Sequence, residues 1–270
     1  MARGAKLGQH FLREPRIARR ILEAAEVQPG HRVLEVGPGP GVLTEPLAKA
    51  VGPDGELVAL ELDTELADAL EGRWDNVTLV RADAVQTDLA AMGRFDRLVS
   101  NLPYQISGPI TAAFLDLLAD PATRWDRAVL MYQREFADRL RAGPGSKAYG
   151  RLSVHAARWC RVSLLRDVPP GCFDPPPKVH SSVLVLDPHP EAPFEVADEA
   201  VWRAVVDGPF QQRRKQLRNT VPPAVAGLGV AKEDALAALE EEGLSSARPE
   251  AVPPARFAAL ANVLAASRGA

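Results

Sequence analysis

The sequence predicts an open, doubly wound α/β domain followed by a small all-helical domain. Three observations support this prediction. Short β-rich runs alternate with helix-spaced segments from about residue 32 onward. A glycine-rich turn follows the first of these runs. After a proline-rich connection near residue 188 the strand signal ends, so we expect one domain over residues 1–188 and a helical one over residues 189–270.

The first domain is expected to hold a mostly parallel sheet. Apolar residues on consecutive positions predict strands that are covered on both faces at "RVLEVG" (32–37), "ELVALEL" (56–62), "NVTLVRA" (76–82), "DRLVSNL" (96–102) and "RAVLMYQ" (127–133). Segments with helical spacing lie between them at 44–51, 64–74 and 106–120. This alternation is typical of parallel strands joined by right-handed helical crossovers.

Two later runs differ from this pattern. The β-branched segments 161–169 and 181–188 have no helix between them, which predicts an antiparallel addition at one edge of the sheet. Beyond the connection "DPHPEAPFEVAD" (187–198), the segments 199–221, 232–243 and 254–269 have helical periodicity and no strand signal.

The composition is that of a globular protein, with 46% hydrophobic and 25% charged residues in 270. No apolar run is long enough to cross a bilayer, and the basic N-terminus lacks the apolar segment of a signal peptide. We therefore expect a cytoplasmic protein without a membrane partner. Cys160 and Cys172, the only cysteines, are too few for a disulfide scaffold or a zinc site and are expected to be buried thiols.

Charge is unevenly distributed despite a formal net charge of −3. Residues 1–20 contain six basic side chains against the single acid Glu14, and "QQRRKQLRN" gathers four more at 211–219. Such segregation can form a local anion-binding face, although solvated helix faces produce the same pattern.

The glycine-rich turn "VLEVGPGPGVLT" indicates a ligand at the first strand end. Gly37, Gly39 and Gly41 allow a tight turn and close approach of the backbone. A dinucleotide fingerprint requires its third glycine at position 42, which is Val42, and the Lys-Ser or Lys-Thr pair of a P-loop is missing. A bound phosphate is therefore not the expected ligand.

Two carboxylates at the next strand ends favour an adenosyl ligand. Glu61 follows Gly41 by 20 residues, a separation at which an acid can accept from both ribose hydroxyls. Asp83, at the end of the third strand, can accept from an adenine amine. Each carboxylate alone could equally cap a helix, but three strand ends in register predict a site for S-adenosylmethionine.

The stretch "SNLPY" (100–104) ends the fourth strand beside this ligand. An adenine amine is a poor nucleophile, and acceptors for both of its hydrogens favour a pyramidal nitrogen. The Asn101 side-chain oxygen and the Leu102 carbonyl can supply these acceptors, Pro103 can lock the turn, and Tyr104 can stack on the base. This pattern predicts methyl transfer to an adenine amine by positioning and electrostatics, without a strong general base.

With these residues in view, the sequence resembles the ribosomal RNA adenine dimethyltransferase family of KsgA-type enzymes. The matching stretches run in the family's order: "LGQHFL", "VLEVGPGPGVLT", "ELD", "ADA", "NLPY", "PGSKAYGRLSV", "FDPPPKVHSSV" and "FQQRRKQLRN". The resemblance implies a Rossmann-like class I methyltransferase fold with a seven-stranded sheet. It also implies dimethylation of two adjacent adenosines near the 3′ end of small-subunit ribosomal RNA by a monomer that acts on the assembling subunit.

The resemblance adds further site residues. It places Gln9, His10 and Leu12 of the N-terminal arm, and Ala84 of the "ADA" stretch, in the cofactor site. Many relatives have Asn where this chain has His10, so the resemblance supports a backbone contact there more than a side-chain contact.

Further side chains are candidate contacts to RNA. Phe173, before three prolines, could cover the second face of an extruded adenine, although it could instead pack its loop against the sheet. The candidate phosphate contacts are Lys147, Arg151, Lys178, Arg213, Arg214, Lys215 and Arg218. The last four are expected on a helix, where some would hold RNA and others would pair with acids of the same domain.

Two alternatives remain open from the sequence. Erythromycin-resistance methyltransferases of large-subunit RNA resemble this family, as do non-catalytic factors that keep its fold. The "FQQRRKQLRN" and "FDPPPKVHSS" stretches favour the small-subunit enzymes, and the intact Asn101–Tyr104 run favours catalysis.

Overall fold

The computed structural model describes residues 9–268, and the chain divides into two compact units. The first comprises the described residues up to Ala137 together with Arg161–Pro188, and the second comprises Asp138–Cys160 together with the residues from His189 onward. The expected boundary at residue 188 is where the chain enters the second unit for the last time. The expectation that 138–160 belongs to the first unit is wrong, because Tyr149 and Val154 pack into the core of the helical unit.

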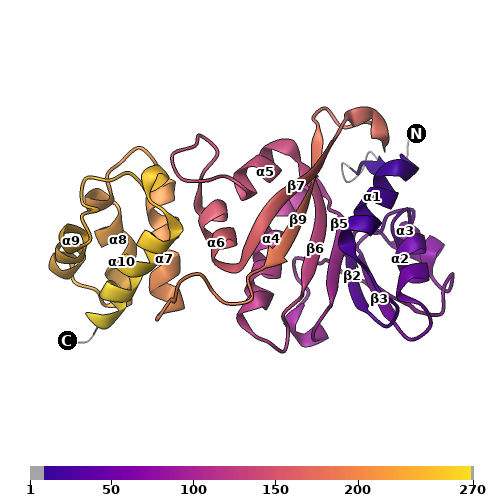
Figure 1. The fold of residues 1–270 in the computed structure, drawn as a ribbon, viewed down its shortest axis with the longest axis horizontal. Coiled ribbons are helices and arrows are strands. Elements are labelled where there is room, and N and C mark those ends of the chain that lie inside the picture. The colour runs from indigo at the N-terminus through magenta and orange to yellow at the C-terminus, as the bar shows by residue number, and fades with distance from the viewer. Residues whose placement is uncertain (1–8, 269–270) are drawn as a thin grey trace. The chain divides into compact units, whose positions relative to one another are not determined.

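The first unit is built on a seven-stranded sheet with strand order β4-β3-β2-β5-β6-β9-β7 (Figure 1). Strands β2 to β6 pair in parallel, whereas β9 runs antiparallel to β6 with Val129 opposite Val185. This confirms the predicted parallel sheet and its antiparallel addition. The strands are β2 (Arg32–Val36), β3 (Glu56–Glu61), β4 (Val77–Arg81), β5 (Arg97–Asn101), β6 (Arg127–Gln133), β7 (Cys160–Val168) and β9 (Ser181–Pro188).

Helices cover both faces of this sheet. Helices α1 (Pro15–Ala25) and α2 (Thr44–Val51) pack on one face, where their buried apolar side chains join a core with Val33, Val99 and Val129. Helix α4 (Ser107–Asp116) lies on the other face, where the Thr111 and Tyr132 hydroxyls are 3.0 Å apart. Helices α3 (Thr64–Leu70) and α5 (Arg134–Leu140) follow β3 and β6.

The N-terminal arm contains structure that the sequence analysis did not predict. Strand β1 (Phe11–Leu12) pairs antiparallel with β8 (Phe173–Asp174), and the Arg13 amide donates to the Cys172 carbonyl at 2.8 Å. Leu12 and Phe173 face each other in this pair and are both buried in the core. The arm is thereby fixed beside the sheet.

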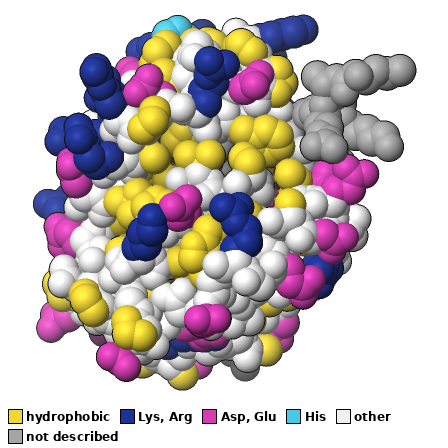
Figure 2. Space-filling view, turned by 90° about the vertical axis from the view of Figure 1, so that its right-hand side faces the viewer, with side chains coloured by type: hydrophobic (Ala, Val, Ile, Leu, Met, Phe, Trp, Pro, Cys, Tyr) yellow, Lys and Arg dark blue, Asp and Glu magenta, His cyan; other side chains and the backbone are white. Residues whose placement is uncertain are grey.

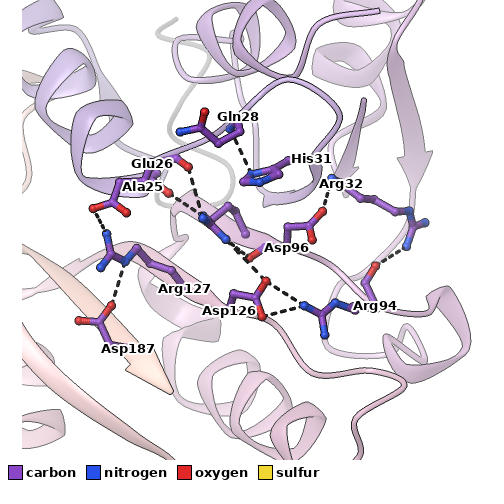
Figure 3. Close-up of polar contacts among 11 residues, drawn as sticks. Ala25, Glu26, Gln28, His31, Arg32, Arg94, Asp96, Asp126, Arg127 and Asp187 are labelled. Carbon is purple, nitrogen blue, oxygen red and sulfur yellow. Dashed lines mark hydrogen bonds and ion pairs between the residues drawn. The ribbon is translucent and has the colours of Figure 1, made fainter. Parts of the chain in front are cut away.

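Charged side chains join helix α1 to the amino ends of the parallel strands (Figure 3). Arg127, at the start of β6, contacts the Glu26 carboxylate and donates to Asp187 Oδ1 at 2.8 Å. Arg94 makes two contacts of 2.8 Å to the Asp126 carboxylate. This network lies at the sheet edge opposite the strand ends that the sequence analysis selected, so we assign it a structural role.

The second unit is helical. Its helices are α6 (Arg151–Trp159), α7 (Glu199–Gln211), α8 (Val221–Val225), α9 (Lys232–Glu241) and α10 (Pro254–Ala266). Trp202, Val205, Phe257 and Leu260 are buried in its core. Across residues 9–268, no helix has both the length and the apolar character needed to span a bilayer.

Candidate functional site

The carboxyl ends of the parallel strands meet at one edge of the sheet and line two adjoining cavities. The β3–β4 cavity, beside Glu61 and Asp83, has a volume of about 230 Å³. The β5 cavity, beside Asn101 and Tyr104, has a volume of about 40 Å³. Gln9, Gly37, Glu61 and Pro103 line both. The strand ends selected from the sequence therefore surround one continuous site.

The glycine-rich turn lies where the two cavities adjoin: Gly37 lines both, and Gly39 lines the β5 cavity. Gly37 and Gly39 have φ angles of +68° and +57°, in the left-handed region that favours glycine. A Cβ at Gly37 would lie 3.0 Å from the Pro103 ring, and one at Gly39 would lie 2.9 Å from the Phe11 ring. The predicted tight turn is confirmed, and the structure shows what approaches it: the "NLPY" segment and the N-terminal arm.

Two carboxylates of the β3–β4 cavity are held by backbone amides. Glu61 is only 5% exposed and accepts from the Gly39 amide at 3.0 Å and from the Asp63 amide at 2.9 Å. Asp83 Oδ1 accepts from the Val85 amide at 2.9 Å. A carboxylate has about four acceptor positions, so both groups can still accept from a ligand. The backbone thus orients each one in advance.

Apolar side chains that the sequence analysis missed complete this cavity. Leu62 is 57% exposed and lines it together with Ile106, Val36 and Leu60. Leu62 directly follows Glu61 at the strand end, where a large apolar residue would ordinarily be covered. Leu62 therefore offers an exposed apolar surface at the wall of this cavity.

The cavity fits the adenosyl part of S-adenosylmethionine. Among the described residues that line it, none is Lys or Arg, so it has no cationic side chain for a phosphate. Two carboxylates can accept from hydroxyl and amine groups, and their negative charge suits a sulfonium cation. The apolar walls suit a purine ring.

The β5 cavity joins the "NLPY" segment to the arm. Asn101 Nδ2 donates to the His10 carbonyl at 3.2 Å, which leaves Oδ1 as the acceptor end of that amide. The Tyr104 hydroxyl lies 2.6 Å from Ser181 Oγ, and the Tyr104 ring centre lies 5.7 Å from that of His10. Burial raises the pKa of the Tyr104 phenol, although the Ser181 hydrogen bond opposes the shift, so this phenol stays neutral near pH 7.

Most of the predicted site residues meet in these two cavities. They are Gln9, His10, Gly37, Gly39, Glu61, Asp83, Ala84, Asn101, Leu102, Pro103 and Tyr104. Leu12 and Phe173 do not join them. Both expectations are corrected, because Leu12 is 3% exposed and Phe173 is 1% exposed, and their side chains pack in the core across the β1–β8 pair.

Comparisons with known proteins agree with this geometry. Residues 3–236 match the family model described as ribosomal RNA adenine dimethylase. The chain belongs to this family. It is 40% identical over 269 residues to the "Probable ribosomal RNA small subunit methyltransferase A" of Methanopyrus kandleri, covering 98% of this chain and 93% of the relative.

Two solved structures share the fold. A dimethyladenosine transferase from Plasmodium falciparum has a TM-score of 0.77 and 27% identity, with 93% of this chain and 96% of that chain covered. The 23S rRNA methyltransferase ErmE has a TM-score of 0.67 and 26% identity, with 94% and 99% covered. This member of the dimethylase family therefore has the class I methyltransferase fold that the sequence predicted.

Glu35 is a buried acid of the dimethylase that the sequence analysis did not single out. It is 2% exposed beneath the glycine-rich turn and accepts from Thr44 Oγ1 at 2.8 Å. Burial raises its pKa to about 8, the Thr44 hydrogen bond lowers it, and the neighbouring charge of Glu61 adds to the rise. The position lies within an apolar strand run, and nothing in the sequence distinguishes a buried carboxyl there.

The candidate RNA contacts of the second unit differ in the structure: one is paired within the unit, and the others are exposed. Helix α7 ends at Gln211, so Arg213, Arg214 and Lys215 lie in the following turn, and Arg218 lies in a short 3-10 helix (Leu217–Asn219). Arg213 is engaged within its own unit: it donates to Glu250 at 2.8 Å and to the Ser146 and Lys147 carbonyls at 3.0 and 2.6 Å. Exposed side chains are those of Lys147, Arg151, Arg214, Lys215 and Arg218, and, in the first unit, Lys178.

Proposed function

We propose that this protein transfers methyl groups from S-adenosylmethionine to the N6 amines of two adjacent adenosines near the 3′ end of small-subunit ribosomal RNA. One observation carries the proposal: the "NLPY" acceptors adjoin the cavity that fits the methyl donor. The Asn101 amide is turned by its bond to the His10 carbonyl so that Oδ1 is the accepting atom. Asn101 and Leu102 line the same small cavity as Glu61.

S-adenosylmethionine, when bound, supplies an electrophilic methyl group on a sulfonium. Asn101 Oδ1 and the Leu102 carbonyl would accept the two amine hydrogens of adenine and hold its nitrogen pyramidal. The nitrogen gains positive charge as the new bond forms, and both oxygens then bind its hydrogens more strongly. The proton of the methylated amine is acidic and can leave to water, so no side chain must act as a strong base.

Tyr104 would hold the target base by its ring face. Its hydroxyl is engaged with Ser181, and its raised pKa keeps the phenol neutral, so neither feature suits a general base. Aromatic stacking of an extruded base contributes about 1–3 kcal/mol. Phe173 packs in the core, and the other aromatic side chains that line this cavity with Tyr104 are His10 and Phe11.

The choice of RNA rests on the relatives more than on the fold. ErmE has the same fold and is named for 23S rRNA, whereas the relative from Methanopyrus kandleri is named for the small subunit and is more similar in sequence. We propose that the substrate is a partly assembled small subunit in the cytoplasm and that the protein acts as a monomer. The exposed basic side chains that follow α7 in the helical unit, Arg214, Lys215 and Arg218, would contact its phosphates.

The test is to map methylated adenosines after adding the protein and donor to small subunits, and separately to large subunits, from a strain that lacks the dimethylase. We expect two adjacent dimethylated adenosines near the 3′ end of the small-subunit RNA. Methylation of large-subunit RNA instead would favour the resistance-type alternative. Tight binding of donor without transfer to either subunit would favour the non-catalytic alternative.

A further inference from the structure

A second hollow of the first unit lies outside the proposed cofactor and target site. It has a volume of about 440 Å³, within the range of pockets that hold small ligands. Ala18, Leu22, Val42 and Pro46 provide apolar walls, and Arg13 and Arg19 provide cationic groups. Figure 2 views the face of the unit that carries α1, α2 and α3, and shows apolar side chains gathered there with both basic and acidic side chains around them.

The hollow is formed in part by the spacing of residues along α1, which has two neighbouring stripes of side chains. Ile17, Ile21 and Ala25 form the stripe that packs into the core. Pro15, Ala18, Arg19 and Leu22 are spaced i, i+3, i+4 and i+7, so they form a neighbouring stripe on the same helix. Val42, just before α2, and Pro46, in the first turn of α2, line the hollow together with this second stripe. On this second stripe Pro15 and Arg19 are exposed and Leu22 is half-buried, beside the buried Ala18, so the helix presents a partly open apolar strip next to an arginine.

Two short chain segments connect the lining of this hollow to the lining of the β5 cavity. Phe11 lines the β5 cavity and Arg13 lines the hollow, two residues further along the arm. Gly39 lines the β5 cavity and Val42 lines the hollow, three residues further along the glycine-rich turn. An extended chain covers at most about 3.6 Å per residue, so the Cα atoms of each of these residue pairs lie within about 11 Å of each other.

The charges of α1 favour an anionic occupant. Residues 13–25 contain four arginines, Arg13, Arg16, Arg19 and Arg20, against two acids, Glu14 and Glu23. Glu14 is used to cap the helix through the Arg16 amide, and the pair between Arg19 and Glu23 is exposed, with an N–O distance of 3.7 Å. An exposed pair of this kind contributes little, so Arg19 can exchange its partner for a phosphate at little cost.

We propose that this hollow, the α1–α2 subsite, binds a nucleotide that flanks the target adenosine in the substrate RNA. The base lies on the apolar strip, and Arg13 and Arg19 contact its phosphate. Grooves for single-stranded nucleic acid pair cationic side chains, which contact the backbone, with side chains on which bases pack. The subsite offers guanidinium groups for the first role and aliphatic walls for the second. The inference rests on the proposed function, because the RNA must be the substrate whose adenosine enters the β5 cavity.

The experiment compares Arg13→Gln/Arg19→Gln with the control Arg16→Gln/Arg20→Gln, which removes the same charge from the same segment (residues 13–20) but outside the subsite. Binding of a naked, unmethylated 3′-terminal small-subunit RNA fragment is measured over a range of salt concentrations. We expect the first variant to bind about tenfold more weakly. We also expect its salt slope to fall by about 0.7 for each phosphate that the arginines no longer neutralise. The control should change less, and donor binding by calorimetry should be unchanged in both.

Two further arms identify the occupant. Pro46→Glu places a carboxylate in the subsite at a position near a helix N-terminus, where an acid is well tolerated, and should also weaken RNA binding. RNA carrying 4-thiouridine next to the adenosine pair should cross-link to a peptide that contains residues 15–25. Equal effects in both arginine variants, or cross-links confined to other peptides, would overturn the subsite.

The outcomes also separate the two proposals. If the parent protein methylates the fragment or the particle while the arginine variant matches the control, the subsite fails and the proposed function stands. If the parent methylates neither, the proposed function fails. Weakened binding to an assembled particle but not to naked RNA would assign the hollow to a ribosomal protein, against the inference.

Discussion

Removing the Asn101 side chain tests the proposed chemistry at its centre. In Asn101→Ala the amine loses the Oδ1 acceptor, and the His10 carbonyl loses the Nδ2 donor that lies 3.2 Å away. Loss of one preorganised hydrogen-bond partner in a transition state costs about 100- to 1000-fold in kcat. The missing bond to His10 costs about 1 kcal/mol of folding stability. Donor binding should weaken only a few-fold, because Glu61 and Asp83 remain in place.

The assay is single-turnover methyl transfer from labelled S-adenosylmethionine to small-subunit particles, with donor affinity measured separately by calorimetry. Asn101→Asp is the matched variant, since it keeps a side-chain oxygen and the size of the residue but removes the Nδ2 donor. It should retain clearly more transfer than Asn101→Ala. A single-turnover rate in Asn101→Ala equal to that of the parent at saturating donor would refute the acceptor role of Asn101.

Other side chains of the site and of the sheet give four more tests. Tyr104→Ala should lower kcat/KM by about 5- to 150-fold through lost stacking, whereas Tyr104→Phe should stay within a few-fold in the same assay. Glu61→Ala should weaken donor binding about 100-fold in calorimetry; an unchanged Kd would remove it from the site. Between pH 4.5 and about 8, Glu35 is protonated in the folded protein but ionised in the unfolded chain. The free energy of unfolding should therefore fall as pH rises through this window, by up to roughly 5 kcal/mol. Denaturant titrations at several pH values should show that Glu35→Gln removes this slope. Arg127→Met should cost about 1–3 kcal/mol in the free energy of unfolding, against less than about 0.5 kcal/mol for the exposed-pair control Lys49→Met.

The sheet and its strand ends could be predicted because their signals are local. Each strand is a continuous apolar run, and the order of parallel crossovers is restricted by handedness. Gly37, Glu61, Asp83 and Asn101 each lie at or just beyond the end of a strand, so the topology brings them to one edge. For this reason the position of the site could be predicted from the sequence.

The errors concern pairings between distant segments. Strand β1 is two residues long and pairs with β8 over a separation of about 160 residues. A strand this short has no apolar periodicity from which it could be predicted. The prediction for Phe173 assumed a loop that presents its ring, whereas the pairing with Leu12 turns the ring into the core. Likewise, Tyr149 and Val154 precede a strand of the sheet unit, but their buried faces complete the helical core.

The arrangement of the donor relative to the "NLPY" segment is the central claim, and a crystal structure with S-adenosylmethionine bound tests it most directly. We expect the ribose hydroxyls to contact Glu61, the adenine amine to contact Asp83, and the sulfonium methyl to face the cavity lined by Asn101 and Tyr104. A donor bound at the sheet edge beside Arg127 and Asp187, or with its methyl turned away from Asn101, would contradict the claim.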